Sequence, residues 1–157
     1  MLFSFTMTKG LAQENIVKFN PLALIVGSLE VGYERSVNDM QSFQVNLAYT
    51  SLSSGDIDYS GFGIGAQYRF YFQDRKDLME GWFAGPSASY SSASADDFDV
   101  SVFTGGGVVG YQWNWEPVTL DFYAGPGYFS VDSNQPDFDF GLDGIGIILG
   151  LSLGFNF

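Results

Sequence analysis

The sequence predicts an all-β fold: an eight-stranded antiparallel up-and-down transmembrane β-barrel. Eight segments alternate between bulky apolar and small or polar residues, and this period of two indicates β-strands. Aromatic residues make up 18% of the 157 residues and glycine occurs 20 times, both high for a soluble domain. No apolar run approaches the roughly 18 residues of a membrane-spanning helix. Any membrane insertion would therefore use a closed barrel.

The last segment, Gly144–Phe157, shows the alternation most clearly. Its second face is mostly glycine and serine, which suit a crowded barrel interior rather than a water-facing sheet. Its first face is bulky and suits lipid: Ile145, Ile147, Leu149, Leu151, Leu153, Phe155 and Phe157.

Seven similar segments precede it, each near or above the roughly 9–11 residues that a tilted strand needs to cross a bilayer. Turn residues separate them, and the connections alternate between short turns and longer loops rich in Ser, Gly and Asp. An even number of strands puts both termini on the side of the short turns. The expected strands are Ile16–Val26, Leu29–Val37, Ser42–Ser53, Tyr59–Phe72, Trp82–Ala93, Val100–Trp115, Val118–Asp132 and Gly144–Phe157.

Residues 1–13 lie outside this pattern, so we expect the barrel to occupy residues 14–157. Leu2–Met7 is a short apolar stretch, and Gly10–Ala12 resembles a signal-peptidase site with small residues at its two key positions. The positively charged beginning of a signal is missing. We interpret this segment as the remainder of an export signal, the alternative being a disordered N-terminus.

Five charged residues interrupt the inward faces of the expected strands. The interior of an eight-stranded barrel has room for side chains and little else, and a buried charge needs a partner. We expect Arg69 to bridge Glu34 and Asp121, with Lys18 nearby and Glu30 further from the short turns. A polar plug is the preferred interpretation. A proton or ion path, and acid–base chemistry by Glu30 and Glu34, are the alternatives.

Seven outward aromatic residues fall at the short-turn ends of their strands. Such clustering predicts an aromatic girdle at the periplasmic interface. The alternative is that these residues belong to the core and fall at these ends by coincidence. The residues are Phe70, Phe72, Trp82, Trp113, Trp115, Phe155 and Phe157.

A short repeat links the fifth and seventh strands. Phe83–Ser87 reads FAGPS and Tyr123–Gly127 reads YAGPG. Because proline removes a ladder hydrogen bond, Pro86 and Pro126 predict two similar bulges or bends.

Composition excludes several functions. The chain has 6 Lys+Arg against 18 Asp+Glu, a formal charge of −12, which argues against binding nucleic acid. Neither cysteine nor histidine occurs, so Ser-His-Asp and Cys-His catalysis and Cys or His zinc sites are ruled out. We expect no enzymatic activity and no cofactor.

The acidic loops are weak metal candidates. Asp137, Asp139 and Asp143 offer oxygen ligands that suit Ca²⁺, but the later Glu of an EF-hand is absent. A solvated loop is the preferred interpretation, and divalent-ion bridging to lipopolysaccharide is the alternative.

The alternating strands, the girdle and the terminal Phe157 together resemble the small outer-membrane β-barrel superfamily. Leu151, Leu153, Phe155 and Phe157 resemble the C-terminal signal read by the barrel-assembly machinery. Residues 17–24, VKFNPLAL, followed by Tyr33-Glu34-Arg35, are similar to a family of uncharacterised small barrels common in Bacteroidetes-type bacteria. The resemblance covers about residues 14–157.

This resemblance implies a Gram-negative outer-membrane protein with periplasmic termini, in contact with lipid, lipopolysaccharide and, during insertion, the assembly machinery. It implies no activity. Barrel lipid enzymes rely on histidine, which this chain lacks. We expect a non-enzymatic integral barrel with a structural role, or an accessory subunit of a larger complex. A soluble lipocalin-like binding barrel and a narrow gated channel remain alternatives.

Overall fold

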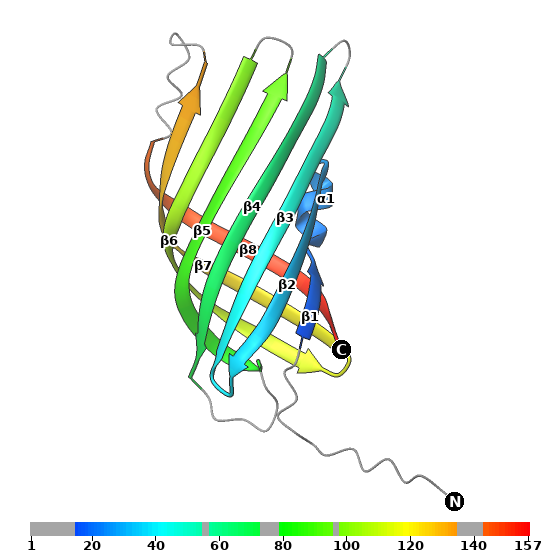
Figure 1. The fold of residues 1–157 in the computed structure, drawn as a ribbon, viewed down its shortest axis with the longest axis vertical. Coiled ribbons are helices and arrows are strands. Elements are labelled where there is room, and N and C mark those ends of the chain that lie inside the picture. The colour runs from blue at the N-terminus through cyan, green and yellow to red at the C-terminus, as the bar shows by residue number, and fades with distance from the viewer. Residues whose placement is uncertain (1–14, 55–56, 73–78, 96–97, 135–142) are drawn as a thin grey trace, which may run out of the picture.

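The computed structural model describes residues 15–54, 57–72, 79–95, 98–134 and 143–157. They form a closed barrel in which each strand pairs with its neighbours in the sequence, β1 closing against β8 (Figure 1). The expected all-β, antiparallel up-and-down, eight-stranded fold is confirmed. The elements are β1 (Asn15–Phe19), α1 (Pro21–Ile25), β2 (Ser28–Asn38), β3 (Gln41–Ser54), β4 (Ile57–Tyr71), β5 (Gly81–Ala95), β6 (Phe98–Trp115), β7 (Val118–Ser133) and β8 (Gly144–Asn156).

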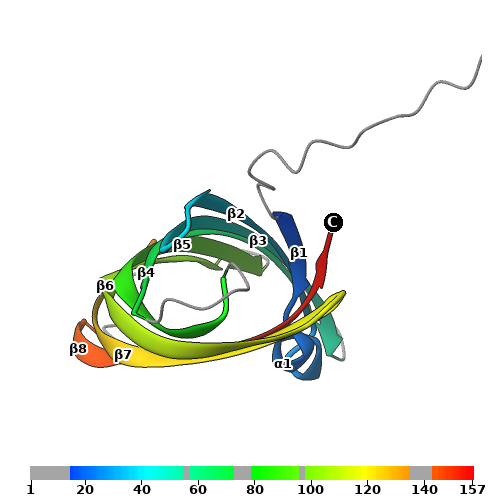
Figure 2. The ribbon, with the colours of Figure 1, turned by 90° about the horizontal axis from the view of Figure 1, so that it is seen from below.

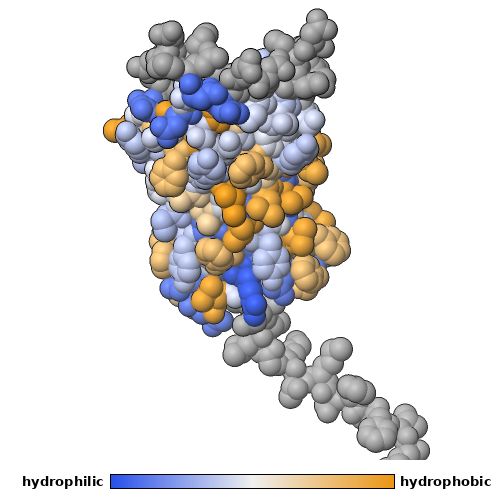
Figure 3. All heavy atoms as spheres, turned by 45° about the horizontal axis from the view of Figure 1, so that its top comes forward, coloured by the Kyte–Doolittle hydropathy of each residue, from blue (hydrophilic) through white to orange (hydrophobic). Residues whose placement is uncertain are grey.

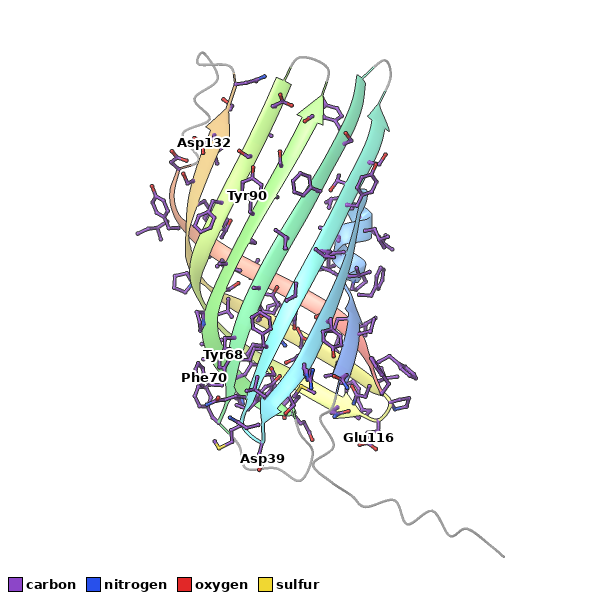
Figure 4. All side chains as sticks on the ribbon, in the orientation of Figure 1. Asp39, Tyr68, Phe70, Tyr90, Glu116 and Asp132 are labelled. Carbon is purple, nitrogen blue, oxygen red and sulfur yellow. The ribbon has the colours of Figure 1, made fainter. Side chains whose placement is uncertain are left out.

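Closure joins the first and last strands at one end of the barrel. Val17 pairs with Phe155 and Phe19 with Leu153, and backbone bonds connect Asn15 with Phe157 at 3.4 and 3.0 Å. Figure 2 shows β1 and the end of β8 side by side. We call this the turn end, because the β2–β3 and β6–β7 turns lie there, and the opposite end the loop end. In Figure 4, Asp39 and Glu116 mark the turn end and Asp132 the loop end.

The expected first strand, Ile16–Val26, is wrong in its second half. The strand stops at Phe19, and Pro21–Ile25 form α1. The Asn20 side chain accepts hydrogen bonds from the Leu22 and Ala23 amides at 3.0 and 3.3 Å, so it caps the helix. Proline suits the first helical turn because its missing N–H would have no partner there. The capping signal of Asn20 and Pro21 therefore favours a helix here, although the apolar residues that follow suggested a strand. The other seven strands begin and end within two residues of expectation.

The shortness of β1 leaves one stretch of β8 without a strand partner on one side. Residues 144–152 pair with β7, but β1 pairs only with residues 153–156. The helix α1 lies beside β2 where a longer β1 would continue (Figure 1). Within the described residues, the ladder between β1 and β8 therefore stops short of the loop end, and α1 lies against both β2 and β8.

Bulky apolar side chains face outward on every strand. Ile145, Ile147 and Phe72 are 88%, 71% and 61% exposed. On the face in Figure 3, hydrophobic residues gather over the middle of the barrel. The buried apolar cluster, by contrast, lies inside the barrel and is small: Ile16, Tyr71, Met79, Phe83, Val108 and Tyr123. None of the described helices is long and apolar enough to cross a membrane.

The two Gly-Pro sites behave alike, as expected from the repeat. The β4–β5 ladder has no paired residues opposite Gly85 and Pro86, and the β6–β7 ladder has none opposite Gly125 and Pro126. The register is unchanged across both interruptions. A Cβ on either glycine would lie 1.8 or 1.9 Å from a carbonyl oxygen of the neighbouring strand, so both sites require glycine.

Candidate functional site

Four charged side chains meet inside the turn-end half of the barrel, and we call them the plug: Lys18, Glu34, Arg69 and Asp121. All four are at most 2% exposed. The strand register places them beside shared neighbours: Glu34 lies opposite Gln44 on β3, Arg69 opposite Ser42 on the same strand, and Asp121 opposite Gln112 on β6. Because side chains alternate between the two faces of a strand, each of these four points inward.

Two cations and two carboxylates pair within the plug. Arg69 Nη1 lies 3.2 Å from Asp121 Oδ2 and 3.5 Å from Glu34 Oε2. Lys18 Nζ lies 2.5 Å from Glu34 Oε2 and also contacts Asp121. The expected bridge of Arg69 is present, and Lys18 joins the same two carboxylates. The four formal charges sum to zero, which limits the cost of burying them.

Three glutamines complete the hydrogen bonding of the cations. Gln67 accepts from Arg69 Nε and Nη2 at 3.1 and 2.9 Å. Gln112 accepts from Arg69 at 3.0 Å and from Lys18 at 2.7 Å, and Gln44 accepts from Lys18 at 3.1 Å. Alternation along the strands is enough to turn these glutamines inward, but their place in the plug's network depends on strand register.

Hydroxyl groups complete the bonding of the carboxylates. Tyr71 donates to Glu34 at 2.9 Å, and Ser42 donates to its same oxygen. Ser152 donates to Asp121 at 2.9 Å. Each charged group therefore has several partners, as buried ions require.

Aromatic rings cover the guanidinium of Arg69. The Arg69 carbon Cζ lies 4.3 Å from the centre of the Phe83 ring and 5.6 Å from that of Tyr123. These contacts are favourable cation–π geometry. Phe83 and Tyr123 are the inward residues that sequence reasoning missed. Their outward neighbours Trp82 and Phe122 would have revealed them by alternation.

Glu30, the fifth predicted residue, lies apart from the plug. Its carboxylate accepts hydrogen bonds from Asn20 Nδ2 at 2.7 Å and Asn46 Nδ2 at 3.0 Å. It borders a cavity of about 240 Å³ on the loop-end side of the plug, together with Gln67, Ser87, Ser89, Tyr123 and Ile148. The site thus has a filled part and a hollow part.

The seven predicted girdle residues all lie on the outside, 37–69% exposed. Trp113 and Trp115 stack with ring centres 6.5 Å apart, and Tyr111 contacts both Trp82 and Trp113 at 5.4 and 4.7 Å. Figure 4 shows Phe70 at the turn end, near Asp39. A position at a membrane interface stays a prediction.

The remaining candidates are partly described. Leu153, Phe155 and Phe157 of the proposed assembly signal are 43%, 56% and 69% exposed on the outer face of β8, and Leu151 is half-buried. Asp143 accepts a hydrogen bond from the Val131 amide at 2.5 Å. Asp137 and Asp139 lie outside the described residues. Among those described, no three Asp, Glu, His or Cys side chains gather as metal ligands.

A protein-family model matches residues 1–144, spanning β1 to β7 and the first residue of β8: "Protein of unknown function (DUF3575)". The chain belongs to the DUF3575 family. A search of curated proteins found no match. DUF3575 membership assigns no activity, and the resemblance to a Bacteroidetes-type barrel family stays a prediction.

In this DUF3575 barrel, the plug's bonding suits closure of the lumen better than chemistry. Every plug side chain is held by several partners, whereas a catalytic acid or base must reach a substrate.

Polar groups also lie between the plug and the turn end. Among the described residues, three buried polar atoms there have no hydrogen-bond partner: Asn114 Nδ2, Thr119 Oγ1 and Asn156 Oδ1.

Proposed function

We propose that the protein is a non-enzymatic integral barrel of a Gram-negative outer membrane, with a structural role or as an accessory subunit of a larger outer-membrane complex. The apolar exterior carries the proposal, because contiguous exposed apolar surface is rare on soluble monomers. Each strand contributes at least one large hydrophobic side chain that is 43–71% exposed: Val17, Val31, Leu47, Phe62, Trp82, Val109, Phe122 and Ile147.

The two faces of the wall also favour this proposal over a soluble ligand-binding barrel. A lipocalin-like barrel would turn its apolar side chains inward to bind an apolar ligand. Here Leu149 and Leu153 are 66% and 43% exposed on the outside, while the interior holds the buried plug. Such an arrangement suits lipid outside and polar contacts inside.

The short turns support an orientation with the turn end, and so both chain ends, in the periplasm, and the girdle supports a membrane interface at that end. Trp and Tyr favour the membrane–water interface because their rings are apolar with a polar group. In this orientation the barrel contacts lipid along its sides and lipopolysaccharide near the loop end. Insertion would involve the barrel-assembly machinery, which reads the C-terminal strand.

Heat-modifiable gel migration after envelope fractionation tests the location. We expect the protein in the detergent-extracted envelope fraction, with a mobility that changes on boiling. In vesicles, lipids brominated near the headgroup should quench Trp82, Trp113 and Trp115 more than lipids brominated at the chain end. Recovery in the soluble fraction without heat modifiability would contradict the proposal and favour the soluble binding barrel.

Mild crosslinking before extraction separates the two roles. A free-standing structural barrel should migrate as a single chain, whereas an accessory subunit should appear in a larger crosslinked product. The partner in that product would then define the role.

A narrow gated channel is the second candidate, favoured by the polar groups on both sides of the plug. Planar-bilayer conductance tests it. We expect no steady current for the wild type or for Arg69→Ala, since Lys18, Phe83 and Tyr71 still fill the lumen. A current that appears only in Arg69→Ala would favour the channel.

A further inference from the structure

The cavity on the loop-end side of the plug is hollow and accessible. Ser89 and Ser91 face the interior yet are exposed, and both border the cavity of about 240 Å³. A ligand can therefore enter from the loop end.

Among the described residues, Glu30 adds a negative charge to the interior that no cation pairs with. The plug has two cations for its two carboxylates. Glu30 borders the cavity, and within the part of the chain that the structure describes its carboxylate receives the amide bonds of Asn20 and Asn46 and no ion pair. A net charge of −12 on the whole chain further favours cations.

The geometry of Glu30 leaves acceptor capacity for a ligand. Asn20 donates to Oε2 and Asn46 to Oε1, so the carboxylate is held by both oxygens. An ionised carboxylate has about four acceptor positions, and these two bonds use half of them. Two further donors can bind while the amides keep the group in place.

The rest of the lining selects the kind of cation. Hydroxyl groups of Ser87, Ser89 and Ser91 on β5 can accept hydrogen bonds, whereas Ile148 and the ring of Tyr123 provide apolar surface. The volume of about 240 Å³ is smaller than the roughly 300–1,000 Å³ of pockets for drug-sized ligands. It suits a short chain with one charged group.

We propose that this cavity binds a small alkylammonium group, with its nitrogen at the Glu30 carboxylate and its alkyl part against Ile148. A primary ammonium has three N–H donors, which match the free acceptor positions of Glu30 and a serine hydroxyl. The site concerns the barrel interior, so the inference does not depend on whether the barrel lies in a membrane.

Titration of the full-length protein in non-ionic detergent micelles, followed by NMR, tests the proposal. The probes are butylammonium and butanol, which have the same alkyl chain. We expect butylammonium to give saturable shifts of the Asn20 and Asn46 side-chain amides, and butanol to give none that saturate in the same range. Equal effects of the two probes would overturn the proposal.

Three variants make the test specific. Glu30→Gln should weaken butylammonium binding roughly twofold to fivefold, the order expected for losing one partly hydrated charge pair. Ser89→Leu, which fills the cavity and keeps Glu30, should abolish binding. Glu116→Gln removes the same charge from an exposed turn at the far end and should change nothing. Unchanged affinity in both cavity variants, or an equal loss in Glu116→Gln, would show general attraction to an acidic protein and overturn the proposal.

Discussion

The two halves of this barrel use the same alternating strands but fill the interior differently. In the turn-end half the inward residues are large and charged, with Arg69 and Lys18 fully enclosed. In the loop-end half they are small, such as Gly63 on β4 and Ser89 on β5, and a cavity remains. Alternation decides which way a side chain points, whereas its size decides whether the lumen is closed.

The difference also separates two ways of satisfying polar groups. The plug is enclosed, so its charges depend on one another and on side-chain partners. The cavity is accessible, so its hydroxyl groups and Glu30 can be hydrated. Substitutions should therefore be costly in the turn-end half and tolerated in the loop-end half.

Arg69→Met should have the largest effect. It leaves Glu34 and Asp121 with Lys18 as their only cation in the plug, and breaking a buried charge network in this way costs about 3–5 kcal/mol. Urea unfolding in detergent micelles, followed by tryptophan fluorescence, measures the change. Arg35→Met removes the same charge from an exposed position on β2 and should cost much less. Similar losses in the two variants would contradict the plug's role in stability.

A matched pair of glycine substitutions compares the halves directly. A Cβ at Gly110 would lie 2.5 Å from the Phe83 ring and 2.6 Å from the Phe122 carbonyl oxygen, whereas at Gly63 the nearest atom is 3.4 Å away. Gly110→Ala should destabilise the barrel by about 1–3 kcal/mol through overpacking. Gly63→Ala should be neutral or stabilise by up to about 1 kcal/mol, because alanine restricts the unfolded chain. The same unfolding assay measures both, and the reverse order would mean that the interior is not divided in this way.

A double-mutant cycle on Lys18 and Glu34 tests whether the plug acts as a unit. Lys18→Met and Glu34→Gln each unbalance the plug, but together they restore a neutral pair of Arg69 and Asp121. We expect the double variant to be more stable than the sum of the single effects predicts, by about 0.5–3 kcal/mol. Lys18 with Glu30, which lies outside the plug, is the control cycle and should couple weakly.

Among the substitutions expected to destabilise the barrel, Asn20→Ala should have the smallest effect. It removes the cap of α1 and the hydrogen bond to Glu30, and the loss of a cap typically costs about 1 kcal/mol. Asn20→Ser keeps a capping oxygen but lacks the amide that donates to Glu30. If stability depends on the cap alone, the serine variant should unfold at the same urea concentration as the wild type.

The plug was partly predictable from the sequence. A charge on an inward face of a narrow barrel must find an opposite charge, and this argument alone paired Arg69 with Glu34 and Asp121. Lys18 was expected nearby, but its contacts with both carboxylates were not. Residues 94 positions apart, such as Lys18 and Gln112, become neighbours only through strand register, which a periodic pattern does not encode.

Strand number, strand direction and the outward face of each strand were determined by the sequence itself, because alternation of side chains is a local property of the backbone. The capping signal of Asn20-Pro21 is local as well. The prediction nevertheless gave more weight to the apolar residues that follow, and so expected a strand where the helix α1 forms. Closure decided the rest. It set the level at which the plug assembles and left the cavity beside Glu30. Among the described residues it also left positions 144–152 of β8 without a strand partner on the β1 side, since each of these features depends on how distant strands align.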